Sequence, residues 1–199
     1  MTFWLGKTQV VVEFGFFVVL GAFLLLDQSG WGGLLLGSVI CHELGHLALL
    51  RRWGVPVQQL RLQPFGVNIR RPPSTLSYRQ EAAVFLAGPG CNALLAALGW
   101  SLREVCPGWA LPLAAVNLVM GAVNLLPVPP LDGGQALRCA LRQGMGPRAA
   151  GQVGFWLALA ALVPMTAGAL VLFWRQGNFT LLILCLGLGW RLTAMPAVK

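Results

Sequence analysis

Charged residues are scarce in this sequence, and their scarcity decides its class. Asp, Glu, Lys and Arg make up 10% of the 199 residues, whereas a soluble domain carries about 25%. Hydrophobic residues make up 57%, and the mean hydropathy is +0.72. The composition excludes an ordinary soluble domain and predicts an integral membrane protein. The length suits a single domain, residues 1–199, with several spans.

Cysteine is also infrequent, and its number is odd. The five cysteines have no framework spacing and fall mostly in apolar runs: Cys41, Cys91, Cys106, Cys139 and Cys185. This pattern speaks against a disulfide framework and predicts buried thiols.

Acidic residues are also few, six against 14 basic residues, which gives a net charge of +8. Hydropathy predicts six spans, at residues 9–26, 31–50, 81–102, 108–129, 152–173 and 178–194. If the amino terminus is cytosolic, only Arg103 and Arg175 of the basic residues lie outside. We therefore expect an all-α, multi-pass protein of the cell membrane with both termini in the cytosol. The basic charge then marks topology and requires no nucleic acid.

A short β-hairpin or re-entrant segment is predicted between the second and third spans. Leu60–Gln63 and Val67–Arg70 alternate in polarity around Pro64-Phe65-Gly66. Its free edge could accept an extended segment as an added strand. The alternative is a plain basic loop held by lipid headgroups.

The sequence has only two histidines, and both lie in the second span, in Cys41-His42-Glu43-Leu44-Gly45-His46. Side chains at i and i+4 share one face of a helix, and Glu43 follows the first imidazole. This HExxH pattern is typical of zinc hydrolases, in which the carboxylate activates a water. The alternative is a pair of histidines in a helix interior. The predicted membrane setting favours function, because ionisable groups are costly there.

A catalytic zinc site needs a third protein ligand, which Cys or a carboxylate must supply here. The acidic residues are Glu13, Asp27, Glu43, Glu81, Glu104 and Asp132. Asp132 combines the cytosolic side with a proline-rich, irregular backbone and a neighbouring Asn124. Elimination favours Asp132, with Glu81 as the second choice. Cys41 could be a ligand only if its helix were distorted.

Three motifs between residues 42 and 134 together resemble the site-2 proteases, which are intramembrane zinc metalloproteases. They are His42 to His46, Ala87-Gly88-Pro89 followed by Asn92, and Asn124 through Leu131-Asp132-Gly133-Gly134. The six-span layout is most similar to the bacterial branch containing stage IV sporulation protein FB. The protease core would cover spans two to four, about residues 31–134, and no CBS or PDZ domain is expected.

The resemblance implies one Zn²⁺ per chain on His42, His46 and Asp132, with Glu43 as the general base. It implies cleavage of a peptide bond in or near the spanning segment of a membrane-tethered substrate, such as a pro-sigma factor. Inhibitory membrane partners are implied as well. The active site would lie on the cytosolic side.

A helical substrate must unwind before it is cut. Residues expected beside the unwound strand are Asn92, Asn124, Gly88, Pro127 and Pro130.

Two other functions fit part of the pattern. One is a membrane-embedded HExxH protease, acting on lipidated peptides, that uses Glu81 as the third ligand. The other is a metal-binding transporter or assembly protein without enzymatic activity. The absence of a repeated half with matching broken helices speaks against a transporter.

Overall fold

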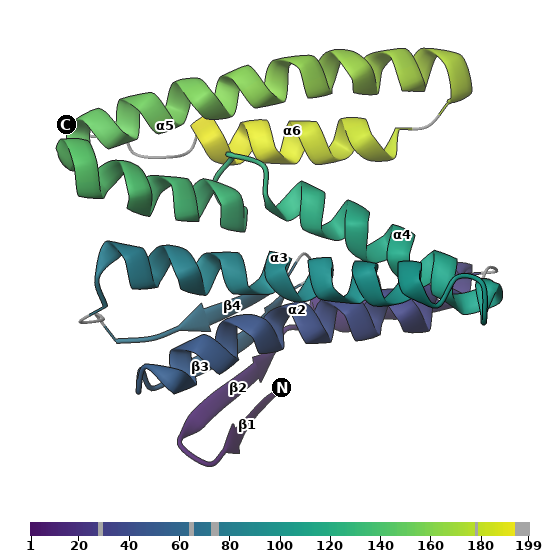
Figure 1. The fold of residues 1–199 in the computed structure, drawn as a ribbon, viewed down its shortest axis with the longest axis horizontal. Coiled ribbons are helices and arrows are strands. Elements are labelled where there is room, and N and C mark those ends of the chain that lie inside the picture. Colours follow the sequence, from purple (N-terminus) through teal and green to yellow (C-terminus); the bar gives the residue numbers. More distant parts are fainter. Residues whose placement is uncertain (28–29, 64–65, 73–75, 178, 194–199) are drawn as a thin grey trace. The chain divides into compact units, whose positions relative to one another are not determined.

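The computed structural model describes residues 1–27, 30–63, 66–72, 76–177 and 179–193. Figure 1 shows the elements: β1 (Thr2–Leu5), β2 (Thr8–Val12), α1 (Phe14–Leu26), α2 (Gly32–Arg52), β3 (Gln59–Gln63), β4 (Gly66–Arg70), α3 (Tyr78–Ser101), α4 (Pro107–Asn124), α5 (Asp132–Gln176) and α6 (Thr180–Thr193). They form two compact units. Unit 1 comprises Met1–Thr75 and Gly90–Val119, and unit 2 comprises Leu76–Pro89 and Met120–Lys199. The helices α3 and α4 each contribute to both.

Three helices of the described chain, α2, α3 and α5, are long and apolar enough to cross a membrane, and α6 is a shorter apolar helix. Large apolar side chains such as Leu44, Val163 and Leu170 are exposed on α2 and α5. An extended apolar surface of this kind is unfavourable in water and suits a lipid environment. The expected membrane protein is supported, while the number of six spans stays a prediction.

The strands of unit 1 form one sheet in the order β1-β2-β3-β4. The pairs β1/β2 and β3/β4 are antiparallel and β2/β3 is parallel, with α1 and α2 in the connection. The predicted hairpin is confirmed as β3 and β4, although its turn residues Pro64 and Phe65 lie outside the described residues. The prediction of an all-α chain with a single hairpin was wrong about β1 and β2. Residues 9–12 had been assigned to the first span, because a short apolar run does not distinguish strand from helix.

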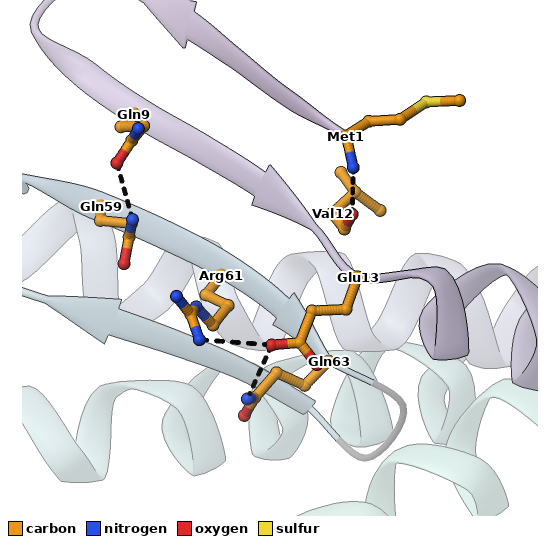
Figure 2. A network of polar contacts seen from close by, with 7 residues as sticks. All are labelled: Met1, Gln9, Val12, Glu13, Gln59, Arg61 and Gln63. Carbon is orange, nitrogen blue, oxygen red and sulfur yellow. Dashed lines mark hydrogen bonds and ion pairs between the residues drawn. The ribbon is translucent and has the colours of Figure 1, made fainter.

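Alternation along β2 explains why it forms a strand. Val10 and Val12 are buried, while Gln9, the residue before Val10, lies on the opposite face and accepts a hydrogen bond from Gln59 Nε2 at 2.7 Å. Figure 2 shows this pair together with the amino group of Met1, which donates to the Val12 carbonyl at 2.7 Å. The Met1–Val12 hydrogen bond closes the amino-terminal hairpin, and the parallel pairing of β2 with β3 joins the hairpin to the rest of the sheet.

The polar end of the sheet carries one ion pair. Glu13 Oε1 accepts from Gln63 Nε2 at 3.2 Å and lies 3.5 Å from an Arg61 guanidinium nitrogen, as Figure 2 shows. Both charged side chains are about one-third exposed, so the pair contributes no more than about 1 kcal/mol. The placement gives Glu13 a role in the sheet.

Two helices, α5 and α3, differ from the predicted spans. The helix α5 begins at Asp132, well before the predicted span at 152, and bends at Gly146, whose φ of 76° suits glycine. The helix α3 continues through Gly88-Pro89-Gly90 without a break. A single proline removes only one backbone donor, so a long apolar helix can continue past it.

The core of unit 2 lies between α5 and α6, which run side by side in Figure 1. Ala158 and Leu162 of α5 pack with Leu188 and Leu192 of α6. Val128, in the segment between α4 and α5, is fully buried in the same cluster. This contact anchors the segment that leads into Asp132.

Candidate metal centre

The buried stripe of α2 carries the two histidines. Ser38, His42, His46 and Leu50 are buried at intervals of four residues, and Gly45 is buried three residues after His42. Such spacing marks one helix face. His42 is 4% exposed and His46 is 7% exposed. The prediction that both imidazoles lie on one face of this helix is confirmed.

The two rings face each other through their Nε2 atoms. These nitrogens lie 3.2 Å apart, and the ring planes meet at 80°. Two nitrogens bound to one tetrahedral Zn²⁺, each about 2.0–2.1 Å from it, would lie about 3.3 Å apart. The spacing therefore suits a hydrogen bond between the rings or two lone pairs directed at one cation.

His42 is held from behind by Asn92 of α3. Its Nδ1 lies 2.6 Å from Asn92 Oδ1, and Asn92 Nδ2 donates to Asn117 Oδ1 at 2.8 Å. Asn92 is fully buried. A ring nitrogen held in this way is the usual arrangement around a metal-binding imidazole. Both polar ends of Asn92 contact the protein, which favours a role in positioning His42 over the predicted contact with substrate.

Glu43 is half-buried and follows His42 directly. One step along an α-helix turns the side chain by about 100°. The Glu43 side chain therefore projects from the face of α2 next to the one that carries His42 and His46. This direction suits a group that exchanges protons near the imidazoles.

Asp132 is the first residue of α5 and is half-buried. The glycines that follow it allow close packing of the preceding segment. A Cβ on Gly134 would lie 2.5 Å from the Pro129 nitrogen and the Val128 carbonyl carbon, and one on Gly133 would collide with the Leu125 backbone. The Asp-Gly-Gly motif thus lets residues 125–129 pack against the first turn of α5.

The other residues predicted to bind substrate are dispersed within unit 2. Pro127 lines a cavity of about 530 Å³ together with Arg138 and Trp156 of α5. Asn124 Nδ2 donates to the Met120 carbonyl in the last turn of α4 at 3.0 Å. Pro130 is exposed and Gly88 is buried within α3.

Among the described residues, one set of three His, Cys, Asp or Glu side chains could hold a metal ion: His42, His46 and Asp132. Glu81, the second choice for the third ligand, is not in this set. Its Oε2 accepts a weak hydrogen bond from Cys139 Sγ at 3.8 Å. Two imidazoles with one carboxylate are a donor set that fits a catalytic zinc site.

Sequence analysis missed Ser38 and Asn117, which continue the hydrogen bonds from Asn92. They are 1% and 0% exposed. A signal was present, because both are polar residues within apolar spans, where such side chains form hydrogen bonds between helices.

Comparisons by sequence and by structure relate this chain to known proteins. Residues 33–108 and 109–165 match the sequence model of Peptidase family M50. Rip3 of Mycobacterium tuberculosis is 34% identical over 161 residues, 72% of this chain and 41% of that protein. The zinc metalloprotease MJ0392 of Methanocaldococcus jannaschii is 28% identical over 159 residues, 73% of this chain and 46% of that protein.

Stage IV sporulation protein FB of Bacillus subtilis is 36% identical over 107 residues, 52% of this chain and 37% of that protein. The chain thus matches less than half the length of these relatives. Among solved structures, the site-2 protease from Methanocaldococcus jannaschii superposes with a TM-score of 0.66 at 22% identity. The superposition covers 97% of this chain and 93% of that one, and it shows a shared fold.

Gly134 provides a test of the packing around Asp132. Gly134→Ala should lower the melting temperature of the full chain, because the added methyl group overlaps backbone atoms; such overpacking costs about 1–3 kcal/mol. Gly144→Ala is the matched control in the same helix, since nothing lies within 4 Å of its Cβ position. It should be neutral or slightly stabilising. Equal melting temperatures for the two variants in detergent would contradict this packing.

Proposed function

We propose, from the premise that this chain belongs to Peptidase family M50, that it is a zinc metalloprotease acting within the membrane. It hydrolyses a peptide bond in or near the spanning segment of a membrane-tethered protein. The observation that carries this proposal is the buried His42/His46 pair with its Nε2 atoms 3.2 Å apart. Its helix is long and apolar enough to cross a membrane.

In this proposal His42, His46 and Asp132 hold one Zn²⁺ per chain. Support comes from the set of three potential ligands and from the spacing of the imidazole nitrogens. The similarity to MJ0392, a zinc metalloprotease, supports it as well. When bound, the ion polarises the scissile carbonyl and lowers the pKa of water toward about 7.

Glu43 moves the proton. Its carboxylate takes a proton from the attacking water as the new carbon–oxygen bond forms, and passes it to the nitrogen when the carbon–nitrogen bond breaks. The amine product leaves neutral and the carboxylate is restored. The place of Glu43 next to His42 on α2 supports this role.

The substrate must present an extended strand, because a helix hides its peptide bonds. Among the described strands, β4 pairs with β3 on one side and ends the sheet. We assign this edge to the unwound substrate, which would add to it as a further strand. Asn124, Pro127 and Pro130 of unit 2 are proposed as further substrate contacts.

The distribution of Lys and Arg supports a cytosolic position for the site and for both termini.

Inhibitory membrane proteins are proposed as partners. A role in sporulation is supported by the 36% identity with stage IV sporulation protein FB. Co-expression with a tagged pro-sigma factor tests that role.

Replacing the proposed base should separate metal binding from catalysis. Glu43→Gln should retain zinc but lose cleavage of a co-expressed, tagged single-span reporter by at least about 100-fold. Glu104→Gln is the control, because Glu104 is exposed and its carboxylate pairs with the Arg103 guanidinium at 3.2 Å. Full cleavage by Glu43→Gln would refute the assigned base.

The third ligand can be identified by elemental analysis of purified variants. Asp132→Asn should lower zinc occupancy markedly, since metal sites lose affinity when an anionic ligand is replaced. Glu81→Gln should keep its zinc, because Glu81 accepts from Cys139. The opposite result would favour the alternative protease with a glutamate ligand. Metal uptake into sealed vesicles without any proteolysis would favour a transporter.

The strand-addition proposal predicts a one-sided crosslinking pattern. A photoreactive residue at Asn68 of β4 should capture the reporter, with Glu43→Gln used to hold it uncut. The same residue at Trp4 of β1, on the opposite edge of the sheet, should not. Capture at Trp4 alone, or at neither position, would exclude β4 as the substrate strand's partner.

A further inference from the structure

A buried chain of hydrogen bonds leads away from His42 through three helices of unit 1. From Asn92 it passes to Asn117, and Asn117 Nδ2 donates to Ser38 Oγ at 2.8 Å. Ser38 returns the chain to α2, one turn before His42. The four side chains are between 0% and 4% exposed, so bulk solvent does not reach them.

Two backbone carbonyls fix the direction of this chain, because a carbonyl oxygen only accepts. Ser38 Oγ donates to the Leu34 carbonyl at 2.7 Å, so the Ser38 oxygen accepts from Asn117. Asn117 Nδ2 also donates to the Leu113 carbonyl at 2.9 Å. The amide of Asn117 therefore has one allowed orientation.

The orientation passes along the chain to the imidazole. Because the oxygen of Asn117 faces Asn92, the amino group of Asn92 must donate to it. The oxygen of Asn92 then faces His42 Nδ1 at 2.6 Å. At that distance two acceptors would repel each other, so Nδ1 must carry the proton.

We propose that Asn117 and Ser38 are positioning residues which, through Asn92, hold His42 as the Nδ1-protonated tautomer with its Nε2 lone pair directed at the metal position. The effect on zinc rests on the proposed function, whereas the tautomer does not depend on it. In the metal-free protein His46 Nε2 then donates to His42 Nε2 across 3.2 Å.

The chain resists reversal because every member is satisfied in one direction only. Turning the Asn92 amide to receive the other tautomer requires the Asn117 amide to turn as well. The Asn117 oxygen would then face the Leu113 carbonyl, and two buried acceptors would be left in contact. A chain that served only to join the helices would need no particular tautomer of His42.

The tautomer can be measured directly, because His42 and His46 are the only histidines. The full chain, labelled with ¹⁵N-histidine and freed of metal in nanodiscs, gives two imidazole spin systems, assigned with a His46→Asn variant. In the parent protein His42 should show a protonated Nδ1 and an unprotonated Nε2. A protonated Nε2 on His42 would overturn the proposal without any variant of the chain.

Variants along the chain separate positioning from helix packing. Asn117→Leu should mix the tautomers of His42 and weaken Zn²⁺ binding about tenfold in competition with a chelator. Ser38→Ala should weaken Zn²⁺ binding no more than about threefold, because Asn117 still donates its hydrogen bond to the Leu113 carbonyl. Asn92→Leu should resemble Asn117→Leu, and Asn92→Asp should restore the Nδ1 proton, since its carboxylate accepts from His42.

Thr166→Val is the matched control. It removes a hydroxyl that donates to the carbonyl four residues earlier at 2.7 Å, as Ser38 does, in α5 of unit 2. Its stability can fall, but its tautomer and zinc affinity should match the parent protein.

Unchanged tautomer and zinc affinity in both Asn117→Leu and Asn92→Leu would overturn the positioning role. Failure of the parent protein to bind Zn²⁺ would overturn the proposed function instead, and the tautomer of metal-free His42 would still decide this inference.

Discussion

The need to satisfy polar groups inside an apolar protein organises this structure. Although the chain is mostly apolar, unit 1 buries two imidazoles, two amides and a hydroxyl. Each is matched with a donor or acceptor on a neighbouring helix, on the same helix or on the backbone. The cost of leaving one unmatched, about 1–3 kcal/mol, makes the arrangement specific. The same matching leaves His42 Nε2 facing His46.

Glycine and proline set the backbone of the second half in a similar way. The segment from Leu125 to Leu131 cannot be helical with three prolines, and it packs against α5 only because residues 133 and 134 lack a Cβ. Asp132 thus opens a helix anchored by the buried Val128. The acidic residue sits on a fixed turn and not on a loop tip.

Local pattern was enough to predict several features. The i, i+4 histidines, the β3/β4 hairpin and the apolar spans α2 and α3 followed from spacing and alternation within a few residues. Periodicity alone could not separate the strand at 8–12 from the start of an apolar helix. The arginine-containing start of α5 also looked like a loop, because charge and glycine lower hydropathy without preventing a helix. The hydrogen bond from Asn92 to Asn117 joins residues 25 positions apart, and the one from Asn117 to Ser38 joins residues 79 positions apart. Such pairings are set by packing and not by local pattern.

The account as a whole depends on a zinc ion held by imidazole nitrogen and carboxylate oxygen in a chain that also contains five thiols. X-ray absorption of the zinc-loaded full chain tests this directly, because zinc lies about 2.0–2.2 Å from nitrogen or oxygen and about 2.3 Å from sulfur. We expect a first shell of nitrogen and oxygen alone, with the outer scattering of two imidazoles. A sulfur neighbour, or a shell with fewer than two imidazoles, would contradict it.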